Sequence, residues 1–138
     1  MDQDKYIFTL EIAVRDYELD SEGIVNNAVY LNYLEHTRHA FIRQEGIPFS
    51  DMVSSGLMPV ARRMTIDYRR PLRSGDVVLS RLWIDRKGPQ IIFHQGLYDK
   101  SNGDLVAKAH VSIVCIEDGK ISRGDELAAR LSQYLDKP

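Results

Sequence analysis

Between Arg15 and Tyr30 the chain reads RDYELDSEGIVNNAVY, a run with several acidic residues, one glycine and two adjacent asparagines. The asparagines stand where a helical pattern begins. Either is a natural N-cap, because its short side chain accepts a hydrogen bond from a free helical N–H group. A helix start also carries unpaired N–H groups and the positive end of the helix dipole, and these form an oxyanion site when aimed at a carbonyl oxygen. A turn followed by an ordinary helix cap explains the same residues without any chemistry.

A long helix is predicted from about Ala28 to Glu45. Tyr30, Leu34, Phe41 and the stem of Arg38 fall on one face at helical spacing. A glycine and a proline follow shortly after, and both favour a helix end. The apolar arc is wide, so we expect this helix to be deeply buried.

Alternation of apolar and polar residues predicts strands around this helix. The predicted strands cover residues 8–15, 64–69, 77–84, 91–97 and 105–115, and a short amphipathic helix is predicted over 125–135. Turn sequences at 87–89 and 99–103 join the last three strands, which should therefore be antiparallel neighbours. The pattern predicts an α+β fold with one helix against a five-stranded antiparallel sheet. Residues 77–84 are apolar on both sides in places, which favours a second subunit on that strand.

The overall composition is typical of a globular protein and excludes several other classes. The chain has 138 residues, of which 43% are hydrophobic and 28% charged, so we expect one globular domain over residues 1–138. Its net charge of −2 gives no electrostatic support for nucleic-acid binding. No apolar run is long enough to span a membrane, no signal peptide is predicted, and the single cysteine, Cys115, reads as a packed thiol. We therefore expect a cytoplasmic protein.

The pattern DxxGIVNNAxYxxYxE, from Asp20 to Glu35, resembles the signature of hotdog-fold thioesterases. A similar loop occurs in the 4-hydroxybenzoyl-CoA thioesterase type and in bacterial acyl-CoA thioesterases. Plant acyl-lipid thioesterases are similar over the preceding VRDYELD as well. The later block MTIDY at 64–68, followed by Pro71 and Gly75-Asp76, also resembles this family. Together the similarity covers about residues 6–123.

The resemblance implies a hotdog fold, with one long central helix wrapped by the sheet, and the hydrolysis of acyl-CoA or acyl-ACP. It implies that Asp20 is catalytic and that the backbone N–H of Asn27 polarises the thioester carbonyl. It also implies a homodimer or homotetramer with each site between subunits. Plant acyl-ACP thioesterases carry Asn and His where this chain has Glu22 and Ile24, so a role for those two side chains cannot be transferred.

Thioester chemistry agrees with so small a set of groups. A thiol is a good leaving group, since an ordinary thiol has a pKa of roughly 8.5. One carboxylate, acting as nucleophile or as general base for water, and one oxyanion site can suffice. The sequence leaves both mechanisms open, and it leaves the acyl group and the carrier open as well.

Further candidate residues surround this loop. Glu35 would orient water or substrate, or simply pair with Arg38 or His39 one turn later. The predicted substrate-binding residues are Gly23, Val25, Asn26, Tyr30, Leu34, Arg86, Lys87 and Arg123. The first three shape the loop, Tyr30 and Leu34 line an acyl tunnel or pack the core, and the three cations dock the phosphate of a carrier or are merely solvated.

Two other functions stay open at this stage. A hotdog hydratase or dehydratase would use a histidine with an acid, and the loop contains no histidine. A non-catalytic acyl-CoA-binding module would have no use for an acid beside the carbonyl, so Asp20 discriminates against it. The four histidines show no metal-ligand spacing, and we predict no metal and no cofactor.

Overall fold

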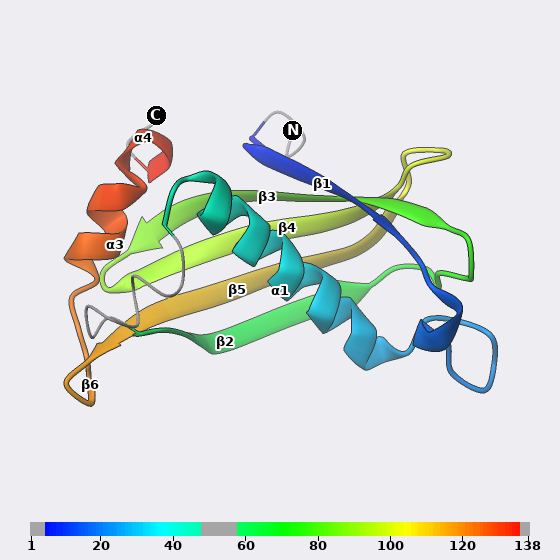
Figure 1. Cartoon of the computed structure of the whole chain (residues 1–138), viewed down its shortest axis with the longest axis horizontal. Helices are drawn as coiled ribbons and strands as arrows, with labels where there is room; N and C mark the ends of the chain where they lie inside the picture. The colour runs from blue at the N-terminus through cyan, green and yellow to red at the C-terminus, as the bar shows by residue number, and fades with distance from the viewer. Residues whose placement is uncertain (1–4, 48–57, 136–138) are drawn as a thin grey trace.

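The computed structural model describes residues 5–47 and 58–135. One long helix, α1 (Asn27–Gln44), lies across one face of an antiparallel sheet (Figure 1). The strands are β1 (Phe8–Ala13), β2 (Met58–Tyr68), β3 (Val77–Lys87), β4 (Gln90–Asp99), β5 (Leu105–Glu117) and the two-residue β6 (Lys120–Ile121). Their order is β1-β3-β4-β5-β2, with β6 paired to β5, which confirms the predicted α+β sheet-and-helix architecture.

Local sequence determines both ends of α1. The side chain of Asn26 accepts a hydrogen bond from the N–H of Ala28 at 2.9 Å, so Asn26 is the N-cap. Gly46 follows the helix with a φ of +76°, a left-handed conformation that favours glycine. Between these ends the predicted face of Tyr30, Leu34, Arg38 and Phe41 is buried against the sheet, as expected.

The strand β2 begins six residues before the predicted start at Met64. The sequence of this part, MPVARR, does not show a strand pattern, because a register shift between Ala61 and Arg63 breaks the alternation of apolar and polar residues. Among the described residues, β2 pairs only with β5 and forms one edge of the sheet. Pro59 is compatible with that position, since an edge strand tolerates a missing N–H donor.

The core lies between α1 and the inner face of the sheet. Phe41, Leu82, Phe93 and Val111 belong to one cluster of buried side chains, and a second cluster surrounds Leu34 nearer the start of α1. The predicted C-terminal helix is two short helices, α3 (Asp125–Arg130) and α4 (Ser132–Leu135), which meet at the fully buried Leu131. None of the helices formed by residues 5–47 and 58–135 is long and apolar enough to cross a membrane.

Candidate active site

The loop between β1 and α1 starts with a single 3-10 turn, η2 (Asp16–Glu18). The Glu18 side chain is only 9% exposed and accepts hydrogen bonds from the Arg15 N–H at 2.8 Å and the Tyr33 hydroxyl at 2.7 Å. Burial, and then the hydrogen bond to Glu18, raise the pKa of Tyr33. Glu18 therefore ties the loop to α1.

Asp20 lies in a tight turn that follows this anchor. Leu19 and Val25 form an isolated β-bridge that closes the turn. The Asp20 carboxylate accepts hydrogen bonds from the N–H groups of Glu22 at 2.8 Å and Ile24 at 3.5 Å. Gly23 completes the turn with a φ of +78°. The carboxylate is thus held by the main chain while the residue stays exposed to solvent.

Asn27 is the first residue of α1, and its N–H is among those that have no acceptor within the helix. The Asn26 N–H donates to the Glu18 carbonyl at 3.0 Å, which fixes the entry to the helix. The Tyr68 hydroxyl donates to the Asn27 carbonyl at 3.0 Å, so the end of β2 braces the same residue. The structure thus brings Asp20, Asn26 and Asn27 into one short segment around the helix start.

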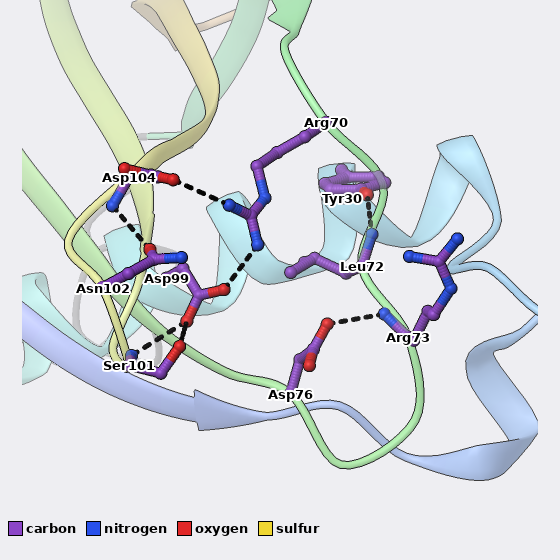
Figure 2. Close-up of polar contacts among 9 residues, drawn as sticks. All are labelled: Tyr30, Arg70, Leu72, Arg73, Asp76, Asp99, Ser101, Asn102 and Asp104. Carbon is purple, nitrogen blue, oxygen red and sulfur yellow. Dashed lines mark hydrogen bonds and ion pairs between the residues drawn. The ribbon is translucent and has the colours of Figure 1, made fainter.

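The segment after β2 supports this helix start from a second side (Figure 2). Leu72 donates its N–H to the Tyr30 hydroxyl at 3.2 Å and accepts the Val25 N–H at 2.8 Å. Arg70 pairs with Asp99 at 2.7 Å and with Asp104 at 3.0 Å, which ties this segment to the β4–β5 turn. Val25 and Tyr30, two predicted substrate-binding residues, therefore hold the segment in place.

The Asp99 carboxylate, which pairs with Arg70, also has hydrogen-bond donors close to it. It accepts hydrogen bonds from the hydroxyl and the N–H of Ser101, at 2.7 and 2.8 Å. These bonds, followed by the charge of Arg70, lower the pKa of Asp99. The ion pair with Arg70 therefore persists throughout the neutral pH range.

A small cavity of about 100 Å³ lies beside the second half of α1. Its wall combines polar and apolar side chains from α1, β2, β4, β5 and α3: Glu35, Arg38, His39, Ile42, Pro59, Ala61, Phe93, Ile113 and Leu127. Glu35 is exposed and belongs to this wall, whereas Tyr30 and Leu34 are 2% and 1% exposed and pack in the core. Tyr30 and Leu34 thus follow the core-packing alternative, and the cavity lies about one turn further along α1.

Two basic side chains of this cavity wall are partly withdrawn from water. Burial lowers the pKa of Arg38, whose guanidinium donates to the Gln95 side chain at 3.0 Å. Burial also lowers the pKa of His39, although the nearby Glu35 acts in the opposite direction. His39 is therefore neutral at pH 7, and the cavity presents one permanent cation and one neutral imidazole.

The predicted phosphate-binding cations lie at the other end of the sheet. Arg86 donates to the carbonyls of Gly88 and Arg123, both at 2.9 Å, and pairs with Asp125 at 2.7 Å. This hydrogen bond from Arg86 lowers the pKa of Asp125. A wide cleft of about 650 Å³ there is lined by Arg86, Gly88, Pro89, Ile121, Ser122, Arg123 and Asp125. Within one protomer, Figure 1 shows that this end is remote from the loop that holds Asp20.

Sequence reasoning missed several residues that build the site. Glu18 and Tyr33 form its buried anchor, Tyr68 braces Asn27, and His39 and Ala61 line the cavity. Glu18, Tyr33 and Tyr68 lie in the segments that resemble the family, but nothing in the sequence showed that their side chains make these contacts. In the two described ranges, no group of three or more His, Cys, Asp or Glu side chains could hold a metal ion.

Comparison with known proteins identifies relatives of this chain. The family described as "Thioesterase-like superfamily" matches residues 14–133. A chloroplastic acyl-acyl carrier protein thioesterase of Arabidopsis thaliana is 47% identical over 101 residues, covering 72% of this chain and 53% of its own. A putative acyl-CoA thioesterase of Bacillus subtilis is 34% identical over 108 residues, or 78% of each chain.

The structural comparison agrees with the sequence comparison. The crystal structure of a probable thioesterase from Escherichia coli superposes with a TM-score of 0.82 at 30% identity, covering 92% of this chain and 98% of that one. This chain spans 53% and 58% of the length of two plant relatives, so roughly half of each plant protein has no counterpart here.

Proposed function

Because the chain belongs to the thioesterase-like superfamily and has the hotdog fold, we propose that it hydrolyses acyl thioesters of coenzyme A or acyl carrier protein. The observation that carries this proposal is the placement of a main-chain-bound Asp20 carboxylate in the loop that leads into the N-terminus of α1. A carboxylate and a free helical N–H are the two groups that a thioester requires.

In the proposed reaction the thioester carbonyl oxygen accepts a hydrogen bond from the Asn27 N–H, which stabilises the negative charge that develops on it. Asp20 takes a proton from the attacking water, or attacks the carbonyl carbon itself and is later released by water. In either route the carbon–sulfur bond breaks and the sulfur leaves as a thiol after gaining a proton. The products are a carboxylic acid and the free carrier thiol.

The acyl group of the substrate would extend along α1. Asn27 and Glu35 are eight residues apart, or about 12 Å along the helix axis. The cavity that begins at Glu35 has apolar walls at Ile42 and Phe93. We propose that the distal part of a longer acyl chain enters this cavity, with Glu35 at its polar rim.

The carrier would be bound with the help of a second protomer. At one end of the edge strand β2, Tyr68 contacts Asn27. At the other end, Met58 pairs with Ile116, a residue of β5 that also pairs with β6. Two β2 strands paired antiparallel would bring Arg123 of one protomer toward Asn27 of the other. The sequence pattern favoured a second subunit on residues 77–84, but these lie in β3, which is paired on both edges by β1 and β4. We propose instead a homodimer through β2, with Arg86, Lys87 and Arg123 facing the phosphate of the carrier bound at the neighbouring loop.

A thiol-release assay over acyl-CoA and acyl-ACP substrates of increasing chain length tests the proposal. We expect turnover of at least one substrate series. If the protein binds acyl-CoA without releasing thiol, it is a binding module and the proposed hydrolysis is wrong. Light scattering at micromolar concentration tests the assembly, since a monomer would contradict a site shared between two protomers.

A further inference from the structure

A second group of titratable side chains lies on the face of the sheet that points away from α1. The strand register places His94 of β4 directly opposite His110 of β5. Their neighbours Phe93 and Val111 face the core, so the two imidazoles face the opposite side of the sheet. The thioesterase mechanism proposed above uses neither histidine.

The two imidazoles are in direct contact. The Nδ1 atoms of His94 and His110 are 2.8 Å apart, with the rings inclined at 76°. On its other side, His94 has its Nε2 atom 3.0 Å from a carboxylate oxygen of Asp85. Trp83 stacks on the His94 ring, with centroids 3.9 Å apart and planes inclined by 15°. The orientation of His94 is therefore fixed from three sides, while 18% of its side chain stays exposed.

From this geometry we propose that His94 and His110 bind a divalent transition-metal ion through their Nδ1 atoms, with water completing the coordination. Imidazole nitrogen is a preferred ligand of Cu²⁺, Ni²⁺ and Zn²⁺. A ligating histidine normally donates its second ring N–H to a carboxylate, which is the contact that His94 makes with Asp85.

Binding of an ion requires the His110 ring to move. In the hydrogen-bonded pair the two Nδ1 atoms point at each other, so an ion about 2.0–2.1 Å from Nδ1 of His94 would lie too close to Nδ1 of His110. Asp85 and Trp83 hold His94 in place, and a turn of the His110 ring would let both nitrogens reach one ion, since His ring torsions are broad.

Metal binding here displaces a proton. In the tautomer of His94 that donates its Nε2–H to Asp85, Nδ1 of His94 accepts the hydrogen bond and His110 donates it. The metal ion takes the place of that proton, which is released to solvent.

Calorimetric titration of the untagged protein with NiCl₂ or CuCl₂ tests this proposal. We expect one ion per chain and, for Cu²⁺, an electron paramagnetic resonance spectrum typical of nitrogen ligands. Tm should rise, because the ion binds the folded protein better than the unfolded chain. His94→Gln and His110→Gln should each abolish saturable binding. Asp85→Asn should keep the site but weaken it by about 10–100-fold.

His36→Gln is the matched control, because His36 is an exposed histidine on α1. It should leave both the affinity and the metal-induced rise in Tm unchanged. Equal binding by the wild type and the folded His94→Gln and His110→Gln variants would overturn the proposal, as would a loss confined to His36→Gln. If the histidine variants do not fold, unchanged Ni²⁺ affinity in Asp85→Asn would overturn the proposal instead.

Discussion

The first turn of α1 and the cavity beside its second half present different chemistry to a substrate. The first turn has main-chain donors, and the loop before it carries the Asp20 carboxylate. Hydrogen bonds from Tyr33 to Glu18 and from Tyr68 to Asn27 hold this region together. The cavity has apolar walls, with polar groups at its rim. Under the proposed function, the start of the helix would hold the reacting atoms, and the cavity would accept acyl groups of variable length. Changes at the first turn should therefore alter kcat, whereas changes at the cavity should alter substrate preference.

The largest effect is expected at the main chain of Asn27. Asn27→Pro removes the proposed oxyanion donor and should lower kcat by about 10²–10³-fold. Proline is tolerated at the first helical position, and Asn26 already has φ −59° and ψ 136°, which suits a residue before proline. Thiol-release kinetics and circular dichroism together would measure the loss in a folded protein.

Asn27→Ala is the control for that experiment, because it changes the side chain and keeps the N–H. It should retain a substantial part of the activity. Equal losses in the two folded variants would show that the side chain matters, not the main-chain donor.

A smaller and more selective effect is expected in the cavity. Ala61→Leu adds a branched side chain to the cavity wall and should lower kcat/KM for the longest acyl chains by about tenfold or more, with little change for short ones. The matched control is Ala129→Leu on an exposed surface of α3. A uniform loss across all chain lengths would argue that the acyl group does not reach this cavity.

The anchor beneath the loop should contribute mainly to stability. Tyr33→Phe removes one hydrogen bond to the buried Glu18 carboxylate, and the free energy of unfolding should fall by about 2 kcal/mol. Tyr17→Phe removes the same hydroxyl from a side chain that is 80% exposed, and should change nothing. Denaturant unfolding of the two variants would measure the difference in stability. Equal stabilities would show that the hydrogen bond between Tyr33 and Glu18 does not anchor the loop.

The smallest expected effect is a pH dependence at the cavity rim. Burial lowers the pKa of His39 in the folded state, so the unfolded chain binds more protons below about pH 6.5. Stability should therefore decrease as the pH falls from 6.5, and His39→Gln should make that decrease shallower. Chemical denaturation at several pH values, with His36→Gln as the control, measures the slope. If the pH dependence of stability is the same in His39→Gln as in the wild type, His39 is not its source.

Local features of the sequence were sufficient for much of the architecture. The asparagine cap, the glycine after α1 and the alternation in β3–β5 each depend on residues close in sequence and were predicted, although the sequence did not decide between Asn26 and Asn27 as the cap. The first half of β2 was missed because its bulge removes the alternation.

The site was less accessible to prediction, because its contacts join distant segments. The Arg70–Asp99 pair and the His94–His110 contact exist only once the strand register is set. Likewise, Glu18 and Asp20 are both acids of one loop. Only the fold shows that Glu18 turns inward to Tyr33 while Asp20 stays at the surface.

Thiol release by Asp20→Asn, measured beside the wild type and Asp16→Asn, tests the central claim most directly. The amide keeps an oxygen that can accept the Glu22 N–H, so the loop should stay folded and KM should change little. Asp20→Asn should lower kcat by at least about 10²-fold, the loss expected for a missing general base. Asp16→Asn should stay active, because Asp16 is engaged by Ser74. Near-normal kcat in Asp20→Asn, with an inactive Asp16→Asn or Glu35→Gln, would contradict the assignment of Asp20.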